Sequence, residues 1–326
     1  MTWLVFFAFL AQTIKSASVF IFGSTGEIIT EKSGSLNMGI PGIMFLGALG
    51  GLLGEQIYIS WVPTGASLNG FMVILMPLIF SMLFAVAGGL LYAFFTVSLK
   101  CNQNVTGLTL TTFGVGLSSF FIGMLNGNRM SEAGLMIQSL FGNQAYWTEH
   151  YISKIFFGQS FFTYLSIIIA IIATIILSKT RIGLNLRACG ENPAAADATG
   201  INVDRYRYLA ILIGSAIAGI GGMAYELDLL KGGYNPKDIV DGMGWLCLSL
   251  VIFSMWKPSI AIGASFLFGG LQQLRYYLVL TSVEQQIFSL TPYVVTILIL
   301  ILTSVLDSKN AQAPQGLGQT YFREDR

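Results

Sequence analysis

The chain has 326 residues, of which 54% are hydrophobic and only 10% are charged, and its mean hydropathy is +0.70. Soluble domains carry about a quarter charged residues, so the composition excludes an ordinary soluble protein and indicates an all-α, polytopic membrane protein. The formal net charge of +1 offers no basic face to neutralise phosphates, which excludes nucleic acid as a partner.

Apolar runs long enough to cross a bilayer, which takes roughly 20 residues, follow one another along the chain. We expect about nine transmembrane helices, within a range of 8–10, some of them broken by glycine and proline. They are expected at residues 3–25, 36–54, 70–98, 104–125, 161–178, 207–227, 241–256, 258–275 and 284–306. Residues 1–306 are therefore predicted to form a single transmembrane domain.

Two segments outside these runs are expected to lie on opposite sides of the membrane. The loop 179–207 holds the densest cluster of lysine and arginine, which favours the cytoplasm. The stretch 126–160 is then a long outer loop, mildly apolar and rich in aromatic residues. The tail 307–326 is polar and glutamine-rich, so we predict a disordered cytoplasmic tail.

The residues that usually carry enzyme chemistry are scattered. Cys101, Cys189 and Cys247 show no metal-ligand spacing, and the single histidine, His150, falls in a polar loop. An intramembrane enzyme would need acids, histidines or cysteines that converge within the spans. We therefore expect neither a catalytic residue nor a metal site.

One polar stretch interrupts the apolar pattern, LRACGENPAAADATGINVDRYRY at residues 186–208. Asn192 can cap a helix and Pro193 suits its first position, since proline lacks the N–H that would be unpaired there. The alanines that follow favour helix, and Gly200 can end it in a left-handed turn. The stretch predicts a short helix with a smooth, small face on the cytoplasmic side.

Two alternatives exist for this short helix. It can lie on lipid headgroups, but an interfacial helix normally carries large apolar residues opposite basic ones. A helix this short is not stable alone in water, and its alanine face suits a groove of another protein. We favour the docking interpretation.

The pattern R-A-x-G-x-N-P-x-A-A-x-x-x-G-I, Arg187–Ile201, resembles the coupling loop of bacterial ATP-binding-cassette permeases in the branch that includes nucleoside, ribose and branched-chain amino-acid permeases. EKSGSLNMGIPGIM at 31–44 and NVTGLTL at 104–110 resemble further blocks of the nucleoside permeases. The resemblance continues through 242–258 and 263–270.

This resemblance implies a mechanism and a set of partners. Two permease subunits, identical or homologous, form the pore in the bacterial plasma (inner) membrane, and each supplies half of it. Cytoplasmic ATPases bind ATP and Mg and move the coupling helix, while an extracytoplasmic solute-binding protein delivers the solute.

No G-x-x-x-x-G-K-[ST] sequence occurs here, so ATP hydrolysis is expected on a separate subunit, and this chain is not expected to be an enzyme or to hold a cofactor. The residues expected to couple to the ATPase are Arg187, Gly190, Glu191, Asn192, Pro193, Ala195, Ala196 and Gly200.

Six positions are candidates for the substrate pathway, because broken helices and amides expose groups that bind polar solutes. Asn37 can face a cavity or join two helices, Asn104 and Thr106 can cap a helix or contact solute, and the aromatic rings can stack on a base or simply pack. The six are Asn37, Gly39, Asn104, Thr106, Phe113 and Trp245.

The spans carry few charges, with Lys15 the clearest exception and Glu226 and Asp228 near an outer end. A charge-poor interior favours a neutral solute, and the resemblance points to a nucleoside. Riboflavin or a ribose-type sugar remains an alternative, as does a stand-alone channel or carrier, which would not need a coupling helix.

Overall fold

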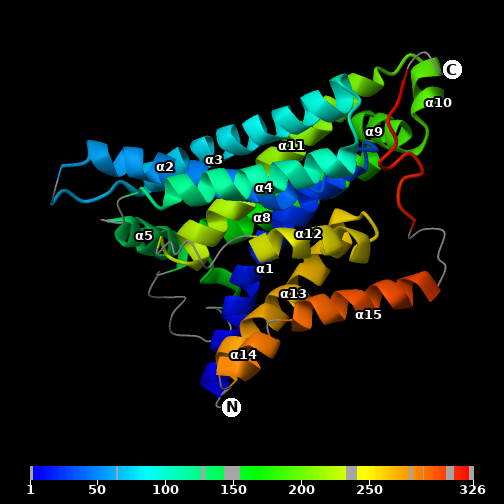
Figure 1. Cartoon of the computed structure of the whole chain (residues 1–326). Helices are drawn as coiled ribbons and strands as arrows, with labels where there is room; N and C mark the ends of the chain where they lie inside the picture. Colours follow the sequence, from blue (N-terminus) through cyan, green and yellow to red (C-terminus); the bar gives the residue numbers. More distant parts are fainter. Residues whose placement is uncertain are drawn as a thin grey trace.

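The computed structural model describes residues 3–63, 65–125, 129–142, 155–232, 241–278, 282–288, 290–305 and 312–322. Every regular element within these ranges is a helix, as the sequence predicts. The helices are α1 (Trp3–Glu31), α2 (Ile40–Trp61), α3 (Gly70–Ala93) with the π-helix η1 (Phe94–Ser98), α4 (Gln103–Ile122), α5 (Met130–Gly142), α8 (Phe161–Lys179), α9 (Arg181–Glu191), α10 (Pro193–Ala198), α11 (Val203–Ala224) with the π-helix η2 (Tyr225–Leu229), α12 (Asp241–Phe253), α13 (Pro258–Tyr277), α14 (Ser282–Phe288) and α15 (Thr291–Val305) (Figure 1).

Asparagine side chains start four of these helices. Asn69, Asn102, Asn192 and Asn202 each accept a hydrogen bond from a backbone N–H two or three residues onward, at 2.9–3.1 Å. The first N–H groups of a helix have no partner within it, and a short polar side chain satisfies one of them. These caps fix where α3, α4, α10 and α11 begin.

The centre of the bundle is formed by α2 and α11. In the most apolar stretch of each helix, 78% of the residues of α2 and 72% of those of α11 are buried, compared with 22% for α3. Glycines allow these helices to touch. A Cβ added to Gly222 would lie 1.8 Å from the carbonyl oxygen of Met44, and one added to Gly47 would lie 2.3 Å from the Cα of Gly219. Small residues of this kind let membrane helices pack backbone to backbone.

The predicted count of about nine membrane-crossing helices is not confirmed within the described residues. Six are long and apolar enough to cross, namely Val5–Glu31, Ile40–Trp61, Gly70–Ser98, Gln103–Ile122, Phe161–Lys179 and Val203–Leu229. The three C-terminal spans we expected correspond to α12, α13 and α15. Of these, α12 and α15 are shorter than the roughly 20 residues that a crossing takes.

The two ends of the chain lie at opposite ends of the molecule (Figure 1). The C-terminal residues 312–322 lie beside α9 and α10, whereas the start of α1 lies at the other end. The expected outer loop contains the helix α5, and its residues 126–128 and 143–154, with His150, lie outside the described residues.

Our expectation of a disordered tail is wrong for residues 312–322, which are packed against the helices; residues 306–311 and 323–326 lie outside the described residues. A polar composition hid this because part of the packing is by backbone hydrogen bonds to distant residues, which composition does not report.

The interior also holds more charge than the sequence suggested. Glu27 and Glu55 are fully buried and Glu31 is 3% exposed. The backbone N–H of Asn37 donates to Glu27, and the indole N–H of Trp256 donates to Glu31. The predicted first span ends at residue 25, whereas α1 continues to Glu31. The small number of charges in the predicted spans is therefore not an argument for a neutral solute.

Candidate functional site

The polar stretch after α8 forms two short helices that meet at Asn192. Thr180 caps α9 by accepting from Gly183 N at 3.1 Å, and Asn192 ends α9 with extended backbone angles. The Asn192 side chain then accepts from Ala195 N at 3.0 Å and starts α10. Pro193 occupies the first turn of α10, and Gly200 follows it with φ +88°. The predicted cap, first turn and left-handed end are confirmed, and α9 is an additional helix.

One side of α10 faces outward. Ala194, Ala195 and Ala198 are exposed, whereas Ala196 and Asp197 are buried. Ala196 packs with Cys189 and Val203 in a small apolar cluster. The exposed side therefore carries methyl groups and backbone only, which makes a shallow, smooth surface at one end of the bundle.

The coupling segment, which we define as Arg187–Ile201, packs closely on the turn between α1 and α2. A Cβ on Gly190 would lie 2.3 Å from the carbonyl oxygen of Lys32. Burial lowers the pKa of Lys32, and the nearby carboxylate of Glu191 opposes that shift. The coupling segment and the α1–α2 turn are therefore in direct contact.

The structure brings all the predicted coupling residues into this one segment. Glu191, Asn192, Ala195 and Gly200 are exposed, Arg187 and Pro193 are half-buried, and Gly190 and Ala196 are buried. The ATPase contact of these residues stays a prediction.

Two of the predicted pathway residues share a groove. Thr106 and Phe113 line a space of about 520 Å³ between the end of α3 and α4. The other lining residues are Leu91, Tyr92, Phe95, Cys101, Asn102, Val105, Thr109 and Leu110. Thr106 donates to the carbonyl of Asn102 at 2.8 Å, as a threonine within a helix often does.

Asn104 does not cap α4, because that position belongs to Asn102, whose side chain accepts from Val105 N. Asn104 is instead the second helical residue and is exposed. Sequence reasoning missed Asn102 because it took the NVTG block as the start of the helix, one residue too late.

Three of the predicted pathway positions lie away from the lining of this groove. Asn37 is fully buried in the α1–α2 turn, where its side-chain oxygen accepts from Gly39 N at 2.9 Å. Gly39 packs on α4, since an added Cβ would lie 2.9 Å from Leu110 and 3.3 Å from the carbonyl of Gly107. Trp245 is half-buried on α12. A solute contact by these residues stays a prediction.

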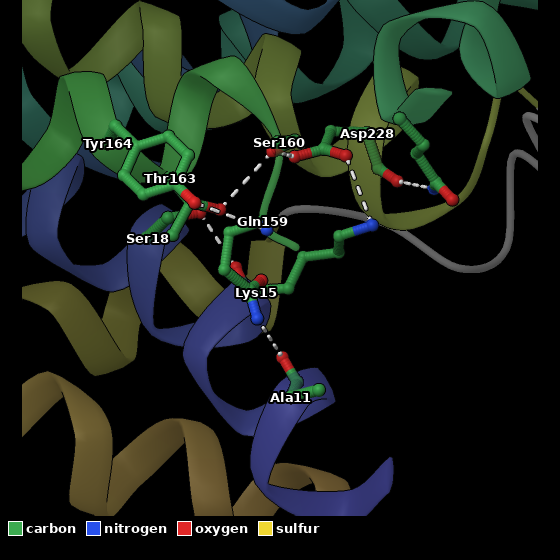
Figure 2. Close-up of polar contacts among 9 residues, drawn as sticks. Ala11, Lys15, Ser18, Gln159, Ser160, Thr163, Tyr164 and Asp228 are labelled. Atoms are coloured by element: carbon green, nitrogen blue, oxygen red, sulfur yellow. Dashed lines mark hydrogen bonds and ion pairs between the residues drawn. The ribbon is translucent and has the colours of Figure 1, made fainter. Parts of the chain in front are cut away.

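A polar network at the far end of α11 was missed by sequence reasoning, which noted Lys15 and Asp228 but not their pairing. Lys15 Nζ lies 3.3 Å from Asp228 Oδ1, and the hydroxyl of Ser160 donates to the other carboxylate oxygen (Figure 2). The Gln138 amide donates to the Asp228 carbonyl at 2.6 Å. The network joins α1, η2, α5 and the start of α8, and a buried carboxylate needs such partners. The sequence did contain a signal for this pairing. Lys15 lies in one predicted span and Asp228 at the end of another, and each charged side chain needs a partner of opposite charge there.

The described residues contain no group of three or more His, Cys, Asp or Glu side chains that could hold a metal ion. The described part of the chain has three notable features: the outward-facing helix α10 at one end, a groove along α4, and a buried polar network around Asp228 at the other end.

Residues 9–303 match the family described as "Branched-chain amino acid transport system / permease component". NupC of Lactococcus lactis, a nucleoside ABC transporter permease protein, is 30% identical over 96% of each chain. NupQ of Bacillus subtilis, a guanosine ABC transporter permease protein, is 29% identical over 96% of each chain. TsgC13 of Haloferax volcanii, provisionally named a glucose ABC transporter permease protein, is 30% identical over 97% of each chain. No solved structure matches this chain significantly.

Proposed function

The chain belongs to the family of permease components of branched-chain amino acid transport systems, and from this premise we propose that it forms half of the pore of an ATP-driven importer for a nucleoside-like solute. It is a multi-pass protein of the inner membrane. The observation that carries the proposal is the capped helix α10, whose alanine face is exposed at one end of the bundle.

The proposed route of force starts at this helix. ATP and Mg bind to a cytoplasmic ATPase, and closure of the ATPase pair pushes on the coupling segment. The segment lies against the α1–α2 turn, and Gly39 at the end of that turn lies against Gly107 and Leu110 of α4. A push at α10 therefore reaches the helix that carries Thr106 and Phe113.

The partners follow from this arrangement. One chain supplies one α4 groove, and a second permease, identical or homologous, supplies the other half of the proposed pathway. An extracytoplasmic solute-binding protein delivers the solute to the end that carries Asp228. The ATPase is a separate subunit, because this chain has no P-loop sequence.

The choice of a nucleoside rests on the relatives named for nucleoside and guanosine transport. The largely apolar groove beside α4, with the ring of Phe113 in its lining, offers a face on which the base of a nucleoside can stack. The relative named for glucose supports a sugar as the second candidate.

The test is uptake of labelled guanosine by cells that contain the ATPase, with and without this subunit. Unlabelled uridine, glucose, ribose, riboflavin and leucine serve as competitors. Uptake that depends on the subunit, is blocked by uridine and is not blocked by glucose or leucine is the expected result. An assembled transporter that takes up glucose but no guanosine would overturn the nucleoside assignment.

A further inference from the structure

The C-terminal segment 312–322 lies beside α9 and α10 in Figure 1. Two backbone hydrogen bonds fix its path. Gly316 N donates to the carbonyl of Gly190 at 2.9 Å, and Gly318 N donates to the carbonyl of Gly34 at 3.1 Å. The segment therefore joins the end of α9 to the α1–α2 turn.

Its side chains and carbonyls reach three further elements. The hydroxyl of Tyr321 donates to Asp197 on α10 at 2.9 Å. The carbonyl of Gln319 accepts from Arg207 Nη1 at 3.2 Å and from the Gln103 amide at 3.4 Å. Arg207 belongs to α11 and Gln103 to α4, so one backbone carbonyl links two membrane helices near their N-terminal ends.

The segment is also anchored by apolar packing. Pro314 is buried, and Ala313 and Leu317 pack on a cluster that includes Leu177, Ala210 and Trp256. Tyr321 packs on the cluster of Cys189, Ala196 and Val203 behind α10. A segment held by burial and by hydrogen bonds at both ends behaves as part of the fold rather than as a loose tail.

The helix α10 needs such support. It has six residues, and helices this short do not persist in water without a partner surface. The pairing of Tyr321 with the buried Asp197 fixes which side of α10 faces inward, and so keeps Ala194, Ala195 and Ala198 outward. Arg207 is only 2% exposed, and a buried cation depends on acceptors such as the Gln319 carbonyl.

We propose that residues 312–322 form a C-terminal strap that is a working part of the coupling element. The strap orients α10 for the ATPase and carries its displacement to α4 and to the α1–α2 turn. Tyr321 is a positioning residue in this account, because it acts through Asp197 and touches neither solute nor ATP. The inference rests on the proposed function for what the strap transmits, but not for where the strap lies.

The transport test compares Tyr321→Phe with Thr320→Ala, a control at an adjacent, exposed residue. We expect Tyr321→Phe to lower ATP-dependent uptake about tenfold to a hundredfold, the factor that a hydrogen bond to a charged group contributes. The amount of chain in the membrane and the amount of co-purified ATPase should stay near the wild-type values, and Thr320→Ala should transport normally. Wild-type uptake by Tyr321→Phe and by a chain truncated after residue 311 would overturn the proposal.

A double-mutant cycle separates positioning from general loss of structure. If Tyr321 acts through Asp197, adding Tyr321→Phe to Asp197→Ala should lower uptake no further than Asp197→Ala alone. Multiplied defects would contradict the proposed pairing.

A second readout does not depend on transport. Truncation after residue 311 should expose Cys189, which is fully buried, and increase its alkylation in a Cys101→Ser background. Unchanged protection of Cys189 would show that the strap is not docked. Lack of ATP-dependent uptake by the wild-type transporter would instead count against the proposed function.

Discussion

Asn192 closes α9 and opens α10 through two hydrogen bonds: its backbone N–H donates to the carbonyl of Ala188 at 3.0 Å, and its side-chain oxygen accepts from the backbone N–H of Ala195 at 3.0 Å. The polar stretch between two membrane helices thereby forms two short helices that meet at Asn192, at one end of the bundle. The coupling segment contacts both the α1–α2 turn and the strap. These two contacts relate the sequence to the proposed transport mechanism.

Removal of this cap is the first prediction. Asn192→Ala should destabilise α10 by about 1 kcal/mol and lower both ATPase co-purification and uptake, with the chain still inserted. Asn192→Asp is the matched control, since aspartate accepts the same hydrogen bond. Equal losses in the two variants would show that the cap is not the reason for either loss.

The outward face of α10 gives the second prediction. Ala195→Trp adds a large side chain at an exposed position, so it should leave the thermal stability of the purified chain unchanged and block recovery of the ATPase with it. Ala195→Ser should bind the ATPase normally. Full ATPase recovery with Ala195→Trp would place the docking surface elsewhere.

The third prediction concerns the ion pair of Lys15 and Asp228 (Figure 2). Lys15→Met leaves a carboxylate that is 1% exposed without its cation, and breaking a buried pair costs about 3–5 kcal/mol. We expect a large fall in the melting temperature of the chain in detergent. The double variant Lys15→Met with Asp228→Asn should recover much of that fall. A double variant less stable than Lys15→Met would contradict this account of the pair.

Close helix packing gives the fourth prediction. Gly222→Leu places a side chain where a Cβ alone would lie 1.8 Å from the carbonyl oxygen of Met44, so α2 and α11 must separate. We expect little folded chain in the membrane, because overpacking by even a few atoms costs about 1–3 kcal/mol. Gly263→Leu is the control, since a Cβ there meets nothing within 4 Å. Similar losses in both variants would show that added bulk, not this contact, is responsible.

Thiol reactivity gives the fifth prediction. Burial raises the pKa of the Cys189 thiol to about 11, so at pH 8 only about one molecule in a thousand carries the reactive thiolate. Cys101 is partly exposed and should be alkylated first. Alkylation of Cys189 should increase as the pH rises towards its pKa, and mass spectrometry of the labelled peptides measures both. Rapid labelling of Cys189 at pH 8 would contradict the packing behind α10.

Much of this arrangement could be predicted from the sequence, because its causes are local. The cap at Asn192, the proline in the first turn and the positive φ of Gly200 depend on neighbouring residues only. The apolar runs likewise predicted the helical class, because an apolar run of about 20 residues is typical of a membrane-spanning helix.

The remaining features depend on contacts that are distant in the sequence. The partner of Lys15 is more than two hundred positions away, and the strap reaches Gly34 and Gly190 through backbone groups that every residue carries. The buried carboxylates Glu27 and Glu31 lie beyond the predicted end of the first span, since two acids end an apolar run in any hydropathy pattern. Only the packed structure shows that Trp256 and the Asn37 backbone receive them.

The most direct test of the coupling account is cross-linking between Ala195→Cys and the ATPase, in a chain whose three native cysteines are replaced and with a short thiol reagent. Leu99→Cys, exposed in the α3–α4 connection at the same end of the bundle, is the control. We predict a cross-link from residue 195 that strengthens when ATP is bound, with little product from residue 99. A complex that hydrolyses ATP and cross-links through residue 99 but not through residue 195 would contradict coupling through α10.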